Sequence, residues 1–271
     1  MKFKIVFSAA EKKREHGTAA HFISSRKPKP TRSLVLIHFP ARNMTLSYYN
    51  DQFDLHCGDL VFVDGKLEGL RGQVVDVTYN FKNKMSDYKR VISVTDTKIH
   101  GKFHFAGSHF VTFDRSILPY EQVITWFKAP EKEDTEIVSG KDGSGFQLYD
   151  LNAMKISDTI AERGHDYYRE NRVRYISLDK THVRAIVEGT QPYELECDYI
   201  DGEIRNLVCD CFCTYTCKHE FAAMLQLKET LASIEKHYSD RFKESRYFAA
   251  VCKETLLNTA MVGKETGSII L

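Results

Sequence analysis

Four cysteines lie within nine residues of the chain, and a histidine follows two residues after the last of them. The segment reads Cys209-Asp-Cys211-Phe-Cys213-Thr-Tyr-Thr-Cys217-Lys-His219. Thiols this close together cannot all pair as disulfides of good geometry, and in a reducing compartment such a cluster is usually a metal site. Any fold of this chain must therefore gather these side chains at one point.

The spacing divides the ligands into two pairs, C-x-C and C-x-H. Thiolate sulfur and imidazole nitrogen suit the borderline softness of Zn²⁺, which prefers four tetrahedral ligands. We expect Cys209, Cys211, Cys217 and His219 to bind one zinc ion; four protein ligands leave no position for water, so the site is structural. Cys213 competes with Cys211 for one position, and Cys211 is preferred because it keeps both one-residue spacings.

A second interpretation makes Cys217 a catalytic thiol and His219 its base. Three further thiols crowd this pair, which favours the metal site. The chain also lacks the G-x-x-x-x-G-K-[ST], H-E-x-x-H, G-x-S-x-G and dinucleotide-binding patterns of common enzymes. We therefore expect no enzymatic activity and no small-molecule substrate.

The chain is expected to be an α+β protein with two modules. Residues 1–127 contain short β-type runs separated by Gly, Asp and Asn turns, which predicts a small β-barrel or a compact sheet. Those runs lie at residues 5–7, 33–39, 60–63, 73–77 and 90–94. The polar, glycine-rich stretch 128–145 is the expected linker. Residues 146–271 then form a helix, β-hairpin, zinc finger and helix module.

Within the second module, Ser157 is the expected N-cap of a helix. Apolar and acidic residues alternate along 193–199, which places Cys197 on the apolar face of a strand. Asp201-Gly202 has the chemistry of a tight hairpin turn. The expected elements are, in order, a helix, four strands and two helices, at residues 157–169, 172–178, 183–188, 193–199, 203–208, 219–231 and 233–259.

This order resembles the SWIM zinc finger over residues 157–232. The C-x-C and C-x-H pairs are separated by five residues, and the Asp201-Gly202 turn precedes the first cysteine. An Arg163-Gly164-x-x-Tyr167-Tyr168 run lies on the expected first helix, and Ala222-Ala223 follows the ligand pair. The resemblance implies a structural zinc and a binding role. Bacterial proteins with this finger often carry a Snf-type helicase motor, which this chain lacks.

Residues 58–77 resemble the KOW element of small SH3-like barrels. They comprise a Gly58-Asp59 opening, a strand, spaced glycines and a valine-rich strand. The spacing before Gly65 is one residue shorter than the common pattern. Such barrels contact RNA or DNA, or serve as protein docking units, so the resemblance implies a fold without choosing a partner.

A basic, proline-rich segment over residues 24–33 is a candidate phosphate contact. Its cations are Arg26, Lys27, Lys29 and Arg32, and it contains no acid. The alternative is a solvated loop.

Within the finger, a second group of candidate contacts lies close to the zinc ligands: Arg205, Phe212, Tyr215 and Lys218. The two aromatic side chains can stack on bases or enter a protein pocket. The alternative is that they cover the metal.

Charge limits the partners. Lys and Arg total 38 and Asp and Glu total 37, a formal charge of +1. Phosphate contacts must therefore come from local patches. No stretch approaches the roughly 18 apolar residues that span a bilayer, and the apolar run at 5–7 is too short for a signal peptide. We expect a cytoplasmic protein with no membrane role.

The expected function is a zinc-binding adaptor for nucleic acid, DNA in preference to RNA, and/or for a protein such as a separate ATP-dependent helicase. The alternative is a protein–protein scaffold with a structural zinc and no nucleic-acid role. An enzyme whose site forms only between the two modules is a third possibility. Salt dependence separates the first two, because phosphate contacts weaken steeply with salt.

Overall fold

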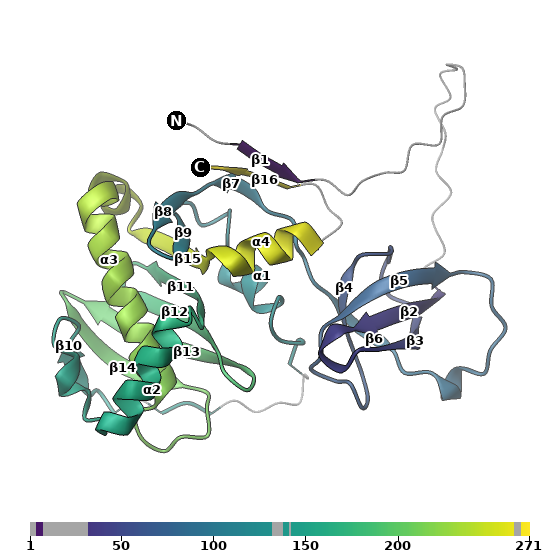
Figure 1. The fold of residues 1–271 in the computed structure, drawn as a ribbon, viewed down its shortest axis with the longest axis horizontal. Helices are drawn as coiled ribbons and strands as arrows, with labels where there is room; N and C mark the ends of the chain where they lie inside the picture. The colour runs from purple at the N-terminus through teal and green to yellow at the C-terminus, as the bar shows by residue number, and fades with distance from the viewer. Residues whose placement is uncertain (1–3, 8–31, 132–137, 141, 263–266) are drawn as a thin grey trace.

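A computed structural model describes residues 4–7, 32–131, 138–140, 142–262 and 267–271. A larger α+β body and a smaller β body lie side by side (Figure 1). The helices of the described residues are α1 Tyr120–Ile124, α2 Asp158–Arg169, α3 Lys218–Ser245 and α4 Lys253–Val262, with 3₁₀ turns at Pro40–Arg42, Met85–Asp87 and Leu151–Met154. The strands are β1 Lys4–Phe7, β2 Ser33–Phe39, β3 Met44–Asn50, β4 Leu60–Val63, β5 Gly72–Thr78, β6 Val91–Val94, β7 His100–Lys102, β8 His104–Ala106, β9 His109–Thr112, β10 Gly145–Gln147, β11 Val173–Asp179, β12 His182–Glu188, β13 Pro192–Ile200, β14 Glu203–Cys209, β15 Tyr247–Cys252 and β16 Gly267–Ile270.

The smaller body is a five-stranded sheet in the order β3-β2-β5-β4-β6. Alternate residues of β2, namely Val35, Ile37 and Phe39, are fully buried on one face. Of the two expected forms, a small β-barrel and a compact sheet, the structure shows a sheet, and no closed barrel is found among the described residues. The edge strands β3 and β6 meet only at an isolated bridge between Tyr49 and Arg90, beside β6, so no ladder of hydrogen bonds closes the sheet.

The strands predicted in this region are confirmed at β2, β4, β5 and β6, within one residue at each end. Gly58, just before β4, and Gly65 and Gly69, between β4 and β5, have φ of 101°, 90° and 82°. Only glycine adopts such angles without strain, which explains their spacing. Strand β3 was not predicted.

The larger body is built on an eight-stranded sheet in the order β10-β14-β13-β12-β11-β15-β9-β8. The expected division of the chain at 128–145 does not follow the sheets. Strands β8 and β9 precede that stretch but belong to this sheet, because β9 pairs with β15. Strand β1, the expected first strand, pairs with β16 near the C-terminal end. Of the stretch itself, residues 132–137 and 141 lie outside the described residues.

Helices cover both faces of the eight-stranded sheet (Figure 1). Helices α2 and α3 pack on one face over a core that includes Ile176, Leu195 and Phe248. Helices α1 and α4 lie on the other face, over Tyr175 and Ile186. The sheet is therefore the central layer of a three-layer body.

Gly164 allows α2 to approach α3 closely at the start of α3. A Cβ at this position would lie 2.7 Å from Phe221 Cδ1 and 3.1 Å from the Lys218 carbonyl oxygen. Both distances are shorter than ordinary van der Waals contact, so a larger residue would push the helices apart. This close crossing holds the first turn of α3, which carries two of the predicted metal ligands.

Two predictions for the larger body are confirmed. Ser157 is the N-cap of α2, with its side chain accepting from Ile160 N at 3.4 Å. Asp201 and Gly202 turn the β13–β14 hairpin with φ of 51° and 86°.

The helix expected over 233–259 is wrong in its middle. Helix α3 continues to Ser245 and ends where Arg246 adopts a left-handed conformation, φ 49°. Residues 247–252 then form β15, which is buried throughout between β11 and β9. A short, continuous apolar run has no period that distinguishes a buried strand from a helix.

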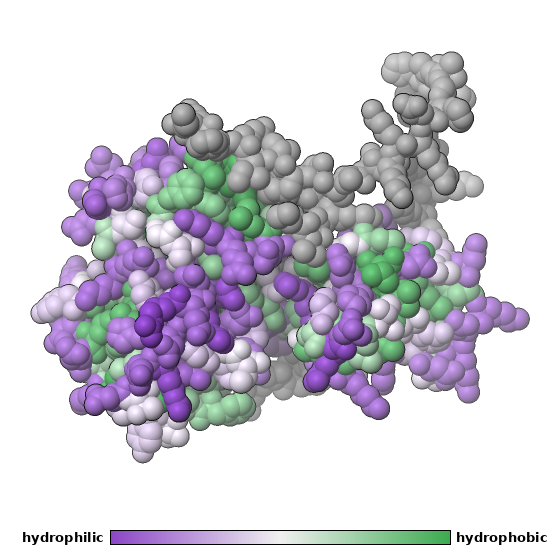
Figure 2. All heavy atoms as spheres, viewed as in Figure 1, coloured by the Kyte–Doolittle hydropathy of each residue, from purple (hydrophilic) through white to green (hydrophobic). Residues whose placement is uncertain are grey.

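The described residues contain no helix with both the length and the apolar character that crossing a membrane requires. On the face shown in Figure 2, polar residues predominate and apolar residues occur in smaller groups.

His109 of β9 is a fully buried titratable group. Its Nε2–H donates to the Val173 carbonyl oxygen at 2.8 Å, and its Nδ1 lies 2.9 Å from Ser108 Oγ. Burial lowers the pKa of His109 to about 4, against an opposing contribution from the Val173 hydrogen bond. The folded protein therefore holds the neutral ring.

We predict that the free energy of unfolding falls as the pH drops from about 6.5 to about 4, because the unfolded chain binds a proton at His109 that the folded chain does not. A pKa difference of this size corresponds to about 3 kcal/mol. His109→Gln keeps a donor for Val173 and should flatten this dependence in urea denaturation series. Other titrating groups are common to both proteins and cancel in the comparison; equal slopes would contradict the prediction.

Candidate metal centre

The predicted ligands lie close together, between the end of β14 and the start of α3. Cys209 is the last residue of β14, Cys217 is the N-cap of α3 and His219 is the second residue of that helix. One ligand atom from each of Cys209, Cys211, Cys217 and His219 lies within 4.8 Å of all the others. Three sulfurs and one imidazole nitrogen at this spacing can hold a metal ion.

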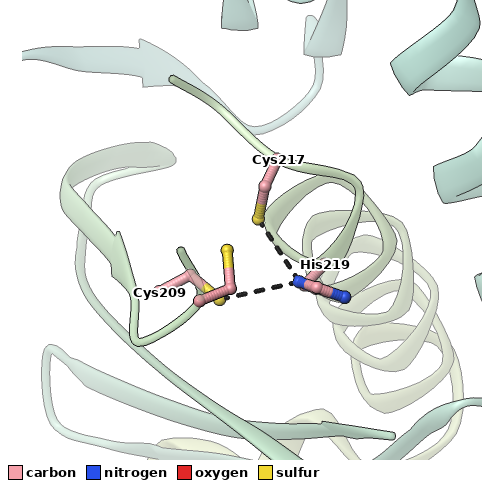
Figure 3. A group of neighbouring side chains, drawn as sticks. Cys209, Cys217 and His219 are labelled. Atoms are coloured by element: carbon pink, nitrogen blue, oxygen red, sulfur yellow. Dashed lines mark hydrogen bonds between the residues drawn. The ribbon is translucent and has the colours of Figure 1, made fainter. Parts of the chain in front are cut away.

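The histidine points one ring nitrogen at the sulfurs. His219 Nδ1 lies 3.6 Å from Cys217 Sγ and 3.9 Å from Cys209 Sγ (Figure 3). Cys213 is exposed and is not part of the four-atom group. The structure therefore selects Cys211, rather than Cys213, as the third thiol of the cluster.

Cys217 places its thiol through a capping box at the start of α3. Its Sγ accepts from Glu220 N at 3.4 Å, and Glu220 Oε2 accepts from Cys217 N at 2.7 Å. The cap satisfies backbone N–H groups that a helix start leaves unpaired. It also directs the sulfur toward Cys209 and His219. The residue that caps the helix therefore also supplies one of the candidate ligands.

The three thiols of the cluster differ in pKa: that of Cys217 is lowered, and those of Cys209 and Cys211 are raised. Hydrogen bonding with Cys209 lowers the pKa of Cys217 to about 4; burial opposes the shift, and His219 and the Glu220 N–H support it. The bond with Cys217, together with burial, raises the pKa of Cys209, and burial raises that of Cys211 to about 12. A cation would favour three thiolates, so metal binding should release protons.

Two backbone N–H groups oppose the raised pKa values of the other two thiols. The N–H of Cys211 acts to lower the pKa of Cys209, and the N–H of Cys213 acts to lower the pKa of Cys211. Such donors stabilise a thiolate and orient it toward a metal. The loop that follows β14 is therefore folded around the sulfurs, although it contains no helix or strand.

Two tyrosines and a glycine hold the imidazole in place. The ring of Tyr193 stacks on His219 with centroids 4.2 Å apart, and that of Tyr167 lies 5.5 Å away. A Cβ on Gly189 would lie 3.3 Å from His219 Nε2. This nitrogen is buried and has no hydrogen-bond partner among the described residues. The ring is thus oriented by packing, with Nδ1 toward the sulfurs.

Of these supporting residues, only Tyr167 belonged to a predicted motif, the Arg-Gly-x-x-Tyr-Tyr run. Tyr193 was predicted on the apolar face of its strand, with no role at the site. No sequence pattern pointed to a role for Gly189 at the site. Its contact with His219 depends on the pairing of β12 with β13, two strands that precede the helix in the sequence.

Lys128 ties the loop of the cluster to the segment after α1. Its Nζ lies 2.6 Å from Asp210 Oδ2 and 2.7 Å from Glu194 Oε1. Asp210 Oδ1 also accepts from Glu194 N at 2.8 Å. Burial acts to lower the pKa of Lys128, but its bonds to Asp210 and Glu194 outweigh that effect and raise it.

Phe212 and Tyr215 do not cover the metal cluster. Their exposed fractions are 96% and 87%, so both rings project into solvent from the loop between Cys211 and Cys217. The alternative in which they shield the metal is therefore wrong.

The remaining candidate contacts that the structure describes are Lys218, Arg205 and Arg32. Lys218 Nζ lies 4.6 Å from the centre of the Tyr167 ring, and Arg205 pairs with Glu203 at 2.7 Å. Arg32 is exposed beside the first strand of the smaller body. The other basic residues of its segment, Arg26, Lys27 and Lys29, lie outside the described residues.

Comparison of the chain with protein-family models, with curated proteins and with solved structures gave no match. The chemistry of the site is therefore inferred from its own residues.

Proposed function

We propose that the chain is a zinc-binding adaptor. The zinc ion joins β14 to α3 through Cys209, Cys211, Cys217 and His219. The loop between the second and third ligands then presents Phe212 and Tyr215 to a partner. The observation that carries this proposal is the exposure of two large aromatic rings on a loop whose two ends, Cys211 and Cys217, both belong to the cluster that can hold a metal ion.

Zinc is favoured over other metals by the donor set and its spacing. In a tetrahedral zinc site with thiolate and imidazole ligands, neighbouring ligand atoms lie about 3.5–3.8 Å apart. Of the two sulfur–nitrogen distances, 3.6 Å lies within that range and 3.9 Å is slightly longer. Four protein ligands leave no open position, so the ion supplies stability and no catalysis. The resemblance to the SWIM finger supports the same assignment.

Single-stranded nucleic acid is the first partner class, DNA ahead of RNA. Bases stack on exposed aromatic rings, and this contact is worth about 1–3 kcal/mol per base. Lys218, at the start of α3, adds a cation close to the same loop. A short loop held at both ends by a metal restricts the two rings, which lowers the entropy cost of binding.

A protein partner, such as a separate ATP-dependent helicase, is the second candidate. The charges beside the loop are mixed, because Asp210 directly precedes Cys211, and both Asp210 and Glu194 pair with Lys128. The whole chain has a formal charge of only +1. Exposed aromatic residues are also frequent anchors of protein interfaces, where mixed charges are tolerated.

The double replacement Phe212→Ala with Tyr215→Ala tests the proposal. Affinity of the zinc-loaded protein for single-stranded DNA, measured by fluorescence anisotropy, should fall roughly tenfold or more, because each lost stacking contact is worth about 1–3 kcal/mol. Zinc content should not change, since neither residue is a ligand.

Tyr149→Ala is the matched control, because Tyr149 is 75% exposed and lies outside the loop. A salt series with single- and double-stranded DNA and RNA separates the partner classes, since phosphate contacts weaken steeply with salt. Unchanged affinity in the double variant would rule out the aromatic loop as the binding surface. Failure of the zinc-loaded wild-type protein to bind any nucleic acid would leave the protein partner.

A further inference from the structure

We propose that Lys128 is a positioning residue for the metal centre: it holds Asp210, and through Asp210 it fixes the two candidate ligands on either side in the arrangement that binds zinc. The inference rests on the proposed zinc site and adds a residue that sets the affinity of that site. Lys128 lies 82 positions before Asp210 in the chain, so this contact exists only in the folded protein.

Asp210 is the middle residue of the C-x-C pair, between Cys209 and Cys211. Its N–H donates to the Glu194 carbonyl oxygen at 3.0 Å, and its Oδ1 accepts from Glu194 N at 2.8 Å. Its Oδ2 accepts from Lys128 Nζ at 2.6 Å. The backbone N–H and both carboxylate oxygens of Asp210 are therefore held, and the residues directly before and after it carry two of the three clustered thiols.

Glu194 is itself held by two donors from residues 120–128. Lys128 Nζ donates to Glu194 Oε1 at 2.7 Å, and the Tyr120 hydroxyl donates to Glu194 Oε2. Tyr120 is the first residue of α1, and the Lys128 N–H bonds to the carbonyl oxygen of Ile124, the last residue of that helix. One short segment therefore contacts both strand β13 and the loop that holds the candidate ligands.

Lys128 places one cation between two carboxylates. The exposed fractions of the side chains are 23% for Lys128, 28% for Glu194 and 39% for Asp210, so water screens these ion pairs only in part. Without the lysine, two negative charges would remain side by side, next to thiols that must become thiolates to bind a metal. Their repulsion would favour other arrangements of the loop, in which the sulfurs are not set for one ion.

Groups that orient metal ligands without touching the metal have a large effect on affinity, and their replacement typically costs about 10–100-fold. Lys128 has this relation to Cys209 and Cys211. Its place in the sequence gave no indication of the role, because Lys128 is the first residue of the stretch expected to be a linker.

The test measures the zinc affinity of the full chain by competition with a chelating indicator. Lys128→Met keeps the length of the side chain and removes its charge, and it should raise the Kd for zinc roughly tenfold or more. Lys128→Arg keeps the cation and should stay within a few-fold of wild type. Lys253→Met is the matched control, because Lys253 Nζ donates to the Gly107 carbonyl oxygen at 2.6 Å, outside the cluster, and its affinity should equal that of wild type.

A double-mutant cycle shows whether Lys128 acts through Asp210. Asp210→Asn keeps an acceptor for the Glu194 N–H and loses the ion pair, so it should raise the Kd several-fold by itself. Adding Lys128→Met to Asp210→Asn should then raise the Kd much less than Lys128→Met does in the wild-type background. If Lys128→Met fails to fold, Asp210→Asn alone carries the test.

Urea denaturation of the metal-free proteins separates positioning from general stability. An ion pair with only a structural role would lower the free energy of unfolding and leave the zinc affinity of the folded protein unchanged. Wild-type zinc affinity in Lys128→Met or in Asp210→Asn would overturn the proposal and leave the zinc site standing, as would equal effects of Lys128→Met in both backgrounds. Absence of zinc binding by the wild-type protein would instead refute the proposed function.

Discussion

Removal of the metal by a chelator should release the turn between β14 and α3 while the rest of the sheet stays folded. The candidate ligands of this turn come from the end of a strand, a loop and the first turn of a helix, so in the proposed zinc site the metal would join these three segments. Zinc binding is worth on the order of 10–16 kcal/mol in small fingers. That is of the same size as the usual net stability of a domain, about 5–15 kcal/mol.

Hydrogen exchange measured by mass spectrometry checks this prediction. Peptides covering residues 205–222 should lose protection when the zinc-loaded protein is treated with EDTA. The five-stranded sheet provides an internal control, because its strands β2 to β6 contribute no ligand to the cluster. Retention of protection over 205–222 in protein shown to be metal-free would contradict the prediction.

Replacement of Cys217 should abolish stoichiometric zinc binding. This residue is both a candidate ligand and the N-cap of α3, and two variants separate the roles. Cys217→Ser keeps an acceptor for the Glu220 N–H but loses the thiolate, whereas Cys217→Ala loses both. Both should lack zinc, and the alanine variant should be less stable by about 1 kcal/mol, the usual worth of an N-cap.

Zinc content by atomic absorption and urea denaturation of the metal-free proteins provide the two measurements. Cys57→Ser, at an exposed thiol outside the cluster, should keep both the zinc and the wild-type stability. Zinc retained at one equivalent in Cys217→Ser would show that Cys217 is not an essential ligand. Equal stability of the serine and alanine variants would show that the cap contributes nothing measurable.

Features that depend on short-range interactions along the chain could be predicted from the sequence. The Ser157 cap, the Asp201-Gly202 turn and the alternation along β13 are decided by neighbours in the chain, through short-range hydrogen bonds and the two-residue period of a strand. The four metal-cluster residues belong to the same class. Their spacing alone limits which side chains can reach one ion, and the structure brings those side chains together.

Pairings between strands that lie far apart in the sequence could not be predicted from it. The partners of β15 lie far away in the sequence, in β9 and β11, and its apolar run fits a buried helix equally well. The same limit applies to β1 with β16, and it explains why the expected division at 128–145 does not match the sheets. The open edge of the five-stranded sheet is likewise a property of how strands meet, which no local pattern encodes.

At the site, the sequence by itself determined which residues gather, and the tertiary structure decided how they are presented. The packing of His219 against Tyr193 depends on the contact between helix α3 and β13. The exposure of Phe212 and Tyr215 depends on how the rest of the fold leaves their loop in contact with solvent. Ligand spacing is a covalent constraint within one short segment. Ring orientation and exposure are set by contacts between segments that only folding brings together.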